Sequence, residues 1–101
     1  MSNSLQDVIL CVAPNGARKT RDDHAAIPIS PAELASEAKA CMDAGAAMIH
    51  LHVRDEAGRH TIAPEFYRPA IAAVREATDE DFIIQITTEA VGIYSNDQQI
   101  A

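Results

Sequence analysis

The sequence predicts an α/β fold built from parallel βαβ units. Apolar runs typical of strands alternate with segments whose apolar residues recur at helical spacing, in the order strand, helix, strand, helix, strand. The strand-like runs are continuously apolar, as in strands that are buried on both faces of a parallel sheet. Because crossovers between parallel strands are right-handed, this order predicts three parallel strands joined by two helices.

The first predicted strand covers residues 8–13 (VILCVA) and ends at the turn sequence PNG. The polar residues 15–29 lack periodicity and predict a long connection, a kind of loop that is often functional. Residues 46–53 and 82–87 are the second and third predicted strands. In the turn after the second strand, Gly58 is suited to a positive φ.

The clearest helix signal begins at residue 30. Ser30 can cap a helix, Pro31 fits its first position, where a missing N–H costs nothing, and Glu33 completes a capping box. Apolar residues then repeat at helical spacing to about residue 44. Gly45 supplies the expected C-terminal cap.

Two further helices are expected downstream. Pro64 opens a helix whose apolar positions repeat to about residue 77, and Ser95 followed by Gln98 resembles the cap of a third. Three parallel strands with two complete helices would leave an open sheet edge, an aggregation-prone arrangement for an independent domain. We therefore expect the 101 residues to be part of a larger unit.

Composition narrows the functional class. A hydrophobic content of 48% is typical of one core-forming domain, and the net charge of −7 argues against nucleic acid or anionic membranes as partners, since both need a basic surface. Cys11 and Cys41 lie in apolar segments and are expected to be reduced core thiols. The start MSNSLQD does not resemble a leader peptide and no apolar run could span a bilayer, so we expect a cytoplasmic protein.

His50 and His52 are the sharpest candidate site. Residues two apart on a strand point to the same face, so both imidazoles can reach one metal ion while Leu51 packs on the other side. The carboxyl ends of parallel strands are also where α/β proteins build their sites. Spacing alone leaves open that both are hydrogen-bonded core residues without a metal. His24 and His60 are expected to be exposed rather than ligands.

Polar residues near the strand ends are further candidates. Arg54, on the same face as the pair, could bind an anionic substrate group or form an ion pair with Asp55 or Glu56. Thr87 could hold a substrate carboxylate or carbonyl, although threonine is favoured in strands in any case. The sequence contains no dinucleotide, phosphate-loop or serine-hydrolase motif, which sets those classes aside.

Three segments of the chain resemble one enzyme family. They are APNGAR (13–18), IPISPAELASEAKACMDAGAAMIHLHVRDEAGR (27–59) and IIQITTEA (83–90). Together they resemble the N-terminal part of the beta-keto acid cleavage enzymes, typified by 3-keto-5-aminohexanoate cleavage enzyme. The resemblance implies that residues 1–101 are the N-terminal βαβαβ portion of a single (β/α)8 TIM-type barrel, a fold of roughly 250 residues.

The resemblance also implies a chemistry. Family members condense a β-keto acid with acetyl-CoA and split the adduct into acetoacetate and a new CoA thioester. Carried over, His50 and His52 are ligands of Zn²⁺, with a downstream glutamate as third ligand and an open position for Lewis-acid polarisation of the β-keto group. Because the residues that resemble the family's base also lie downstream, we expect the chain alone to be inactive and the full-length protein to be oligomeric.

The family pattern assigns two binding candidates and shows two departures. Thr87 stands where the family has a Ser or Thr that touches the substrate carboxylate. Arg18 stands where the aminohexanoate enzyme has a glutamate for the substrate's amino group, so charge complementarity predicts a keto acid with an anionic or polar distal group. Glu89 replaces a glycine of that enzyme.

Two alternatives remain open at this point. One is another metal-dependent barrel enzyme such as an amidohydrolase, which also uses two histidines separated by one residue but normally places them on the first barrel strand. The other is a truncated, non-catalytic product that folds by association.

Overall fold

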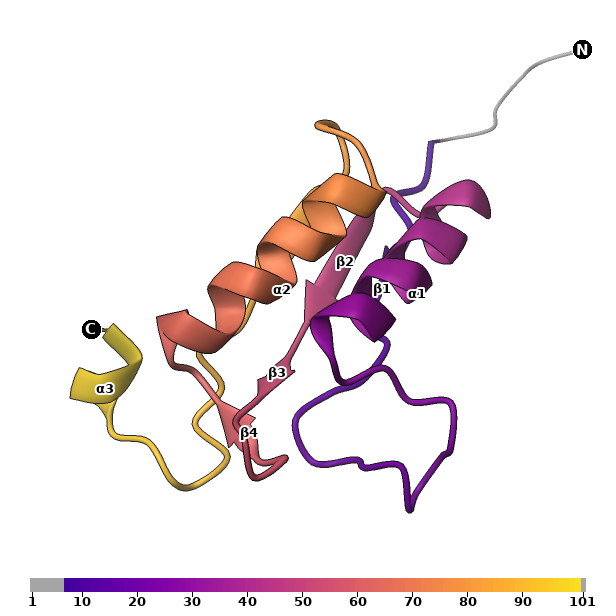
Figure 1. Ribbon diagram of the computed structural model, residues 1–101. Helices are drawn as coiled ribbons and strands as arrows, with labels where there is room; N and C mark the ends of the chain where they lie inside the picture. Colours follow the sequence, from indigo (N-terminus) through magenta and orange to yellow (C-terminus); the bar gives the residue numbers. More distant parts are fainter. Residues whose placement is uncertain (1–6, 101) are drawn as a thin grey trace, which may run out of the picture.

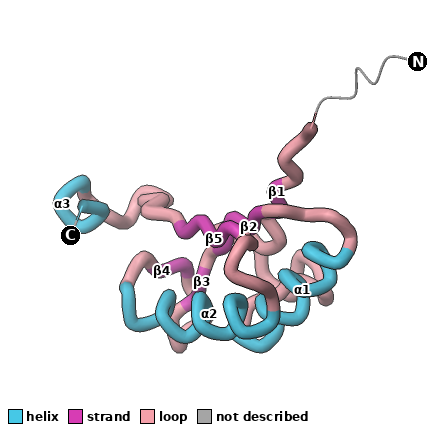
Figure 2. Tube along the Cα trace, turned by 90° about the horizontal axis from the view of Figure 1, so that it is seen from above, coloured by secondary structure: helices cyan, strands magenta, loops and turns pink. Residues whose placement is uncertain are grey.

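A three-stranded parallel sheet with two helices on one face forms the centre of the computed structural model, which describes residues 7–100. In this part of the chain the strand order is β1 (Cys11–Val12), β2 (Met48–Leu51), β5 (Ile83–Ile86), with β2 parallel to both neighbours. Helices α1 (Pro31–Asp43) and α2 (Pro64–Ala77) lie side by side against the sheet (Figure 1) and on the same face of it (Figure 2). The predicted α/β class with parallel strands is confirmed.

The strands are shorter than predicted. β1 has two residues instead of the six of 8–13, and the side chains of residues 8–10 are more than half exposed. β1 is an edge strand of the described sheet, and the helices cover its neighbour β2 instead. The expectations that this strand is buried on both faces and that Cys11 is a core thiol are therefore wrong, since Cys11 is exposed. Cys41 is partly buried against the core, and both thiols are free.

The ends of α1 follow the sequence prediction. The Ser30 hydroxyl accepts a hydrogen bond from the Glu33 N–H (3.1 Å), and the Glu33 carboxylate accepts one from the Ser30 N–H (3.1 Å), so the capping box is confirmed. Gly45 has a φ of +113° and donates its N–H to the carbonyl of Met42, which closes the helix. This conformation suits glycine because side chains with a Cβ rarely adopt it.

The third predicted cap is also confirmed. Helix α3 (Asn96–Ile100) begins where the Ser95 N–H donates to Oε1 of Gln98 (2.8 Å) and the Gln98 N–H donates to Oγ of Ser95 (3.3 Å). Between residues 7 and 100, no helix is long and apolar enough to cross a membrane. The expectation about a leader peptide falls on residues 1–6, which lie outside the described residues.

The hydrophobic core lies between the two long helices and β2. Leu34 of α1, Val74 of α2, and Ile49 and Leu51 of β2 are all fully buried. Each aliphatic side chain buried in this way contributes about 1.5–3 kcal/mol relative to an exposed one. Because side chains alternate along a strand, His50 lies on the other face of β2, away from the helices.

A hairpin follows β2 and was not predicted. The predicted strand 46–53 is in fact two elements, β2 and β3 (Val53–Arg54), and β3 pairs antiparallel with β4 (His60–Thr61). The turn between them forms as predicted: Asp55 Oδ1 accepts two backbone N–H hydrogen bonds (2.9 and 3.0 Å), and Gly58 has a φ of +79°. The hairpin folds the chain back beside the carboxyl end of β2.

Candidate functional site

His50 and His52 lie side by side at the carboxyl end of β2. Leu51, between them, is fully buried in the core, so the two rings share the opposite face of the strand. Their centroids are 5.2 Å apart, and the ring planes are inclined at 71°. Imidazole nitrogens bind zinc at about 2.0–2.1 Å, so rings at this separation can bind one common ion.

Gln85 contacts the first of these rings. His50 and Gln85 are directly opposite each other in the parallel pairing of β2 and β5, and Gln85 Oε1 lies 2.7 Å from His50 Nδ1. Sequence reasoning missed this residue. The available signal was the period of two in the third strand, which puts Gln85 on the same face as Thr87.

The main chain of His52 is held by a side chain from the long loop. Asn15 donates from Nδ2 to the His52 carbonyl (2.7 Å) and accepts at Oδ1 from the His52 N–H (3.2 Å). The Asn15 side-chain amide therefore makes the same two hydrogen bonds to the His52 backbone that a residue of a neighbouring strand would make. Sequence analysis predicted only a turn at this position.

The ring of His52 is buried, with only 4% of the residue exposed. Its Nδ1 atom has no hydrogen-bond partner within residues 7–100, and Oε2 of Glu89 lies 3.7 Å from it. Desolvation by burial, followed by the neighbouring His50, lowers the pKa of His52. The ring is therefore neutral near pH 7, which is the form that binds metal ions.

A third imidazole, His60, joins this cluster. It is 6% exposed, so the expectation that it is an exposed residue is wrong. Its ring centroid lies 5.6 Å from that of His52, and its Nε2 lies 2.7 Å from the backbone carbonyl oxygen of Glu89. The β3–β4 hairpin produces this placement. His24, by contrast, is exposed as predicted.

Arg54 binds the backbone of the long loop. Its Nη2 donates to the carbonyls of Gly16 (2.7 Å) and Lys19 (3.1 Å), and only 7% of the residue is exposed. It forms no ion pair with Asp55 or Glu56 in the part of the chain that the structure describes. Burial lowers the pKa of its guanidinium, yet an arginine remains charged near pH 7. A substrate-binding role for Arg54 stays a prediction.

The two remaining binding candidates differ in their surroundings. Thr87 is partly buried at the end of β5, where its Oγ1 accepts the Glu89 N–H (3.0 Å) and its carbonyl accepts the hydroxyl of Tyr67 (3.2 Å). Desolvation raises the pKa of Tyr67, so this hydroxyl remains a donor. Arg18 is exposed, in the loop segment that Arg54 holds on either side. Their roles toward a substrate stay predictions.

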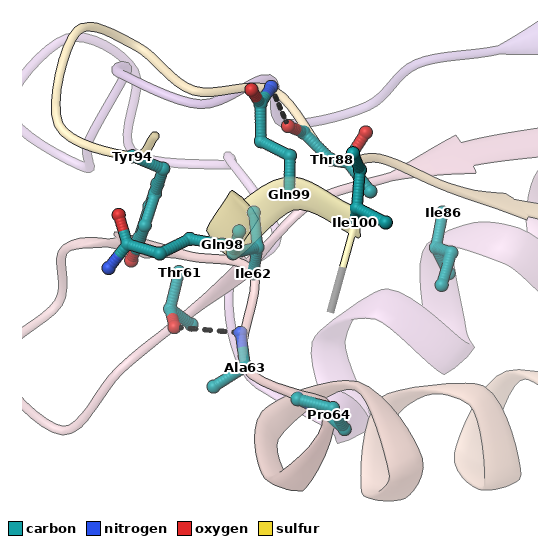
Figure 3. A pocket seen from close by; sticks show the side chains of 10 residues that line it. All are labelled: Thr61, Ile62, Ala63, Pro64, Ile86, Thr88, Tyr94, Gln98, Gln99 and Ile100. Atoms are coloured by element: carbon teal, nitrogen blue, oxygen red, sulfur yellow. Dashed lines mark hydrogen bonds between the residues drawn. The ribbon is translucent and has the colours of Figure 1, made fainter. Parts of the chain in front are cut away.

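A cavity of about 610 Å³ lies next to the histidine cluster, between the start of α2, the end of β5 and α3 (Figure 3). Its lining is mainly apolar, and it contains none of the five predicted site residues. Tyr94, which lines it, has its ring centroid 6.2 Å from that of His60. In Figure 3 the side chain of Gln99 crosses to the backbone of Thr88, to which it donates a hydrogen bond of 2.7 Å.

The two histidines fit a metal ion as part of its ligand set. Neutral imidazoles suit zinc, and the ring of His52 is buried, with an Nδ1 atom that has no hydrogen-bond partner among the described residues. Within residues 7–100 no group of three or more His, Cys, Asp or Glu side chains is arranged to hold a metal ion. The described residues thus offer two nitrogen ligands, and any further protein ligand would come from outside them.

Comparison with known proteins gives a consistent picture. A family model described as beta-keto acid cleavage enzyme matches residues 7–101. The chain is 35% and 37% identical to 3-keto-5-aminohexanoate cleavage enzymes of Acetoanaerobium sticklandii and Fusobacterium nucleatum, over 88% of this chain and 33% of each relative. It is 32% identical to a 3-dehydrocarnitine:acetyl-CoA trimethylamine transferase of Rhizobium meliloti, over 81% of this chain and 27% of that protein. The chain spans about a third of the length of these curated relatives.

Proposed function

The chain belongs to the beta-keto acid cleavage enzyme family, and from this premise we propose that residues 1–101 are the N-terminal portion of a zinc-dependent enzyme that exchanges acyl groups between a β-keto acid and acetyl-CoA. The observation that carries the proposal is the pair of adjacent imidazoles at the carboxyl end of the central parallel strand. The acetyl-CoA partner is suggested by the activity named for the Rhizobium meliloti relative, a 3-dehydrocarnitine:acetyl-CoA trimethylamine transferase.

We place these residues at the start of a (β/α)8 barrel. The strand order, the parallel pairing and the two helices on a single face all suit the first units of such a barrel. Ile83 and Ile86 are 51% and 45% exposed on β5, and residues 8–10 are exposed next to β1. Exposed apolar surface at both edges of the described sheet is what further strands and helices of a barrel would cover.

The proposed exchange conserves every atom. The bond between the carboxylate-bearing CH2 group and the keto carbon breaks, and that two-carbon unit joins the acetyl group of acetyl-CoA to form acetoacetate. The remaining acyl group takes the CoA thiol and leaves as a new thioester. A zinc ion held by His50 and His52 would supply Lewis-acid polarisation of the keto oxygen.

The chain's own residues hold and prepare this site. The lowered pKa of His52 keeps its ring neutral and able to bind a metal, and Asn15 fixes the main chain from which that ring projects. Gln85 orients the ring of His50. The match to the beta-keto acid cleavage enzyme family supports this proposal over the amidohydrolase alternative.

Substrate selection is assigned to three residues. The Thr87 hydroxyl is proposed to bind the keto acid carboxylate, and the exposed cation of Arg18 an anionic or polar distal group. Arg54 would act on the substrate through the loop that carries Arg18. A full-length enzyme that prefers an amino-substituted keto acid to an anionic one would contradict the assignment of Arg18.

Location and assembly complete the proposal. We propose a cytoplasmic homo-oligomer with small-molecule partners. The net charge of −7 gives no attraction to nucleic acid or anionic lipid.

Metal analysis tests the proposed function most directly. We expect near-stoichiometric zinc in the intact protein by elemental analysis, and loss of both zinc and acetoacetate formation in the His50→Ala/His52→Ala variant. His24→Ala is the matched control, because His24 is exposed and outside the cluster, and it should retain zinc. A folded intact protein without bound zinc, or a double variant that keeps it, would refute the metal assignment.

A further inference from the structure

We infer that Gln85 and Glu89 are positioning residues that place the protons of His50 and His52 on Nδ1, which leaves the Nε2 atom of both rings free to bind a metal ion. The inference rests on the proposed function, because it describes how this chain prepares the two rings for that ion. The predicted proton positions are those of the metal-free protein, so they can be measured without zinc. A neutral imidazole has one N–H and one lone pair, so the neighbour of one nitrogen decides the role of the other.

The contact between His50 and Gln85 fixes the first ring. Oε1 of Gln85 lies 2.7 Å from Nδ1 of His50, and an amide oxygen only accepts hydrogen bonds. With this oxygen facing the ring, the hydrogen bond places the proton on Nδ1. The two residues are opposite each other in the parallel pairing of β2 with β5, so the backbone holds their side chains next to each other.

Glu89 is placed to do the same for the second ring. An ionised carboxylate only accepts hydrogen bonds, and its Oε2 lies 3.7 Å from Nδ1 of His52. That separation is longer than a hydrogen bond, and the Glu89 side chain is 49% exposed. The Nδ1 atom is buried without a hydrogen-bond partner in the described residues, so a short movement of Glu89 would satisfy it.

The backbone of Glu89 is fixed from two sides. Its N–H donates to Oγ1 of Thr87 (3.0 Å), and its carbonyl oxygen lies 2.7 Å from Nε2 of the buried His60. His60 therefore helps to hold the Glu89 backbone in place. Gln85 lies opposite His50 in the pairing of β5 with β2, so this acceptor and this ring share one face of the sheet.

The protonation site of each ring can be read by long-range ¹H–¹⁵N NMR of the zinc-free intact protein. We expect His50 and His52 to carry the proton on Nδ1. Gln85→Leu should move the proton of His50 to Nε2, and Gln85→Glu should keep it on Nδ1. His24 is an internal reference for the opposite form, because its Nδ1 accepts the N–H of Ala26 (3.1 Å).

The second ring is tested in the same spectra. Glu89→Leu should change His52 and leave His50 unaffected, whereas Glu89→Gln retains an oxygen acceptor and should restore the wild-type signal. Wild-type rings protonated on Nε2, or spectra that neither leucine variant changes, would overturn the inference. A purely structural role would disturb both rings together and would not be rescued by Gln85→Glu or Glu89→Gln.

Zinc affinity gives an independent readout. Loss of a hydrogen-bond partner behind a metal-binding histidine typically weakens metal binding about 10–100-fold, and we expect this for Gln85→Leu and Glu89→Leu by calorimetry. Glu56→Gln, a change to an exposed acid in the turn, is the matched control and should leave affinity unchanged. The expected protonation pattern in a wild-type protein that binds no zinc would support the positioning by Gln85 and Glu89 but overturn the proposed function. Unchanged affinity in both leucine variants would overturn the positioning alone.

Discussion

The two faces of the central sheet differ in what they contribute. On the face covered by α1 and α2, Ile49 and Leu51 are fully buried in the core. The opposite face carries the histidine pair and Gln85, and Ile83, on this face of the neighbouring strand, is 51% exposed. Stability in the described residues is therefore concentrated on one face and the candidate chemistry on the other. Substitutions can separate the two.

The largest expected effect is on the helix-covered face. Leu34→Ala removes a fully buried side chain and should lower the free energy of unfolding by about 2–5 kcal/mol, measured by chemical denaturation. Ile83→Ala, on half-exposed β5, should change it by less than about 0.5 kcal/mol. Equal losses of unfolding free energy in the two variants would contradict the difference between the faces, since they would show that both faces are packed in solution.

A smaller effect is expected where the long loop meets the strand ends. Arg54→Leu removes the hydrogen bonds to the carbonyls of Gly16 and Lys19 and should cost about 1.5–3 kcal/mol, because charged donors are involved. Limited proteolysis should then cut residues 15–29 faster. Arg68→Leu is the control, as Arg68 is an exposed arginine of α2. A similar loss in this control would mean that the loop is not held by Arg54.

The helix cap gives an effect of about 1 kcal/mol. Ser30→Ala removes the acceptor for the Glu33 N–H and should lower the free energy of unfolding by that amount. Ser36→Ala, at an internal position of the same helix, should be neutral or slightly stabilising, since alanine is the better helix former. Denaturation curves of the two variants test this, and a destabilised Ser36→Ala protein would contradict it.

Thiol labelling compares the accessibility of the edge strand with that of the helix layer without any substitution. Cys11 on the edge strand is exposed, whereas desolvation, followed by the neighbouring Glu37, raises the pKa of Cys41. A raised pKa means less thiolate at a given pH, so Cys41 should be alkylated more slowly than Cys11 in a mass-spectrometric time course. Equal rates would indicate that the helix layer opens frequently.

Local signals predicted much of this fold. The capping box at Ser30, the turn glycine Gly58 and the cap at Ser95 each depend on residues within a few positions, and all three form as predicted. The length of β1 and the exposure of Cys11 could not be predicted in this way, because burial depends on which elements cover an edge strand.

In the candidate site, too, local features were predicted and long-range contacts were not. The proximity of His50 and His52 follows from strand periodicity and was predicted. The residues that contact them were not predicted. Asn15 and Gln85 come from other segments of the chain, and the β3–β4 hairpin that places His60 beside His52 has no clear signal in the sequence. Register and hairpin pairing are tertiary properties, and a single sequence contains only weak signals for them.

The hydrogen bonds around the histidines also set the order in which the molecule can assemble. Asn15 and Gln85 are separated from the histidines they contact by 37 and 35 residues, whereas the contacts that cap the helices span three. Contacts between distant segments require closure of long loops and form slowly, while helical turns form early. The helices should therefore appear first during refolding, and the paired imidazoles should reach their final arrangement in the last step. Zinc binding would then be a late-acquired property that reports the completion of folding.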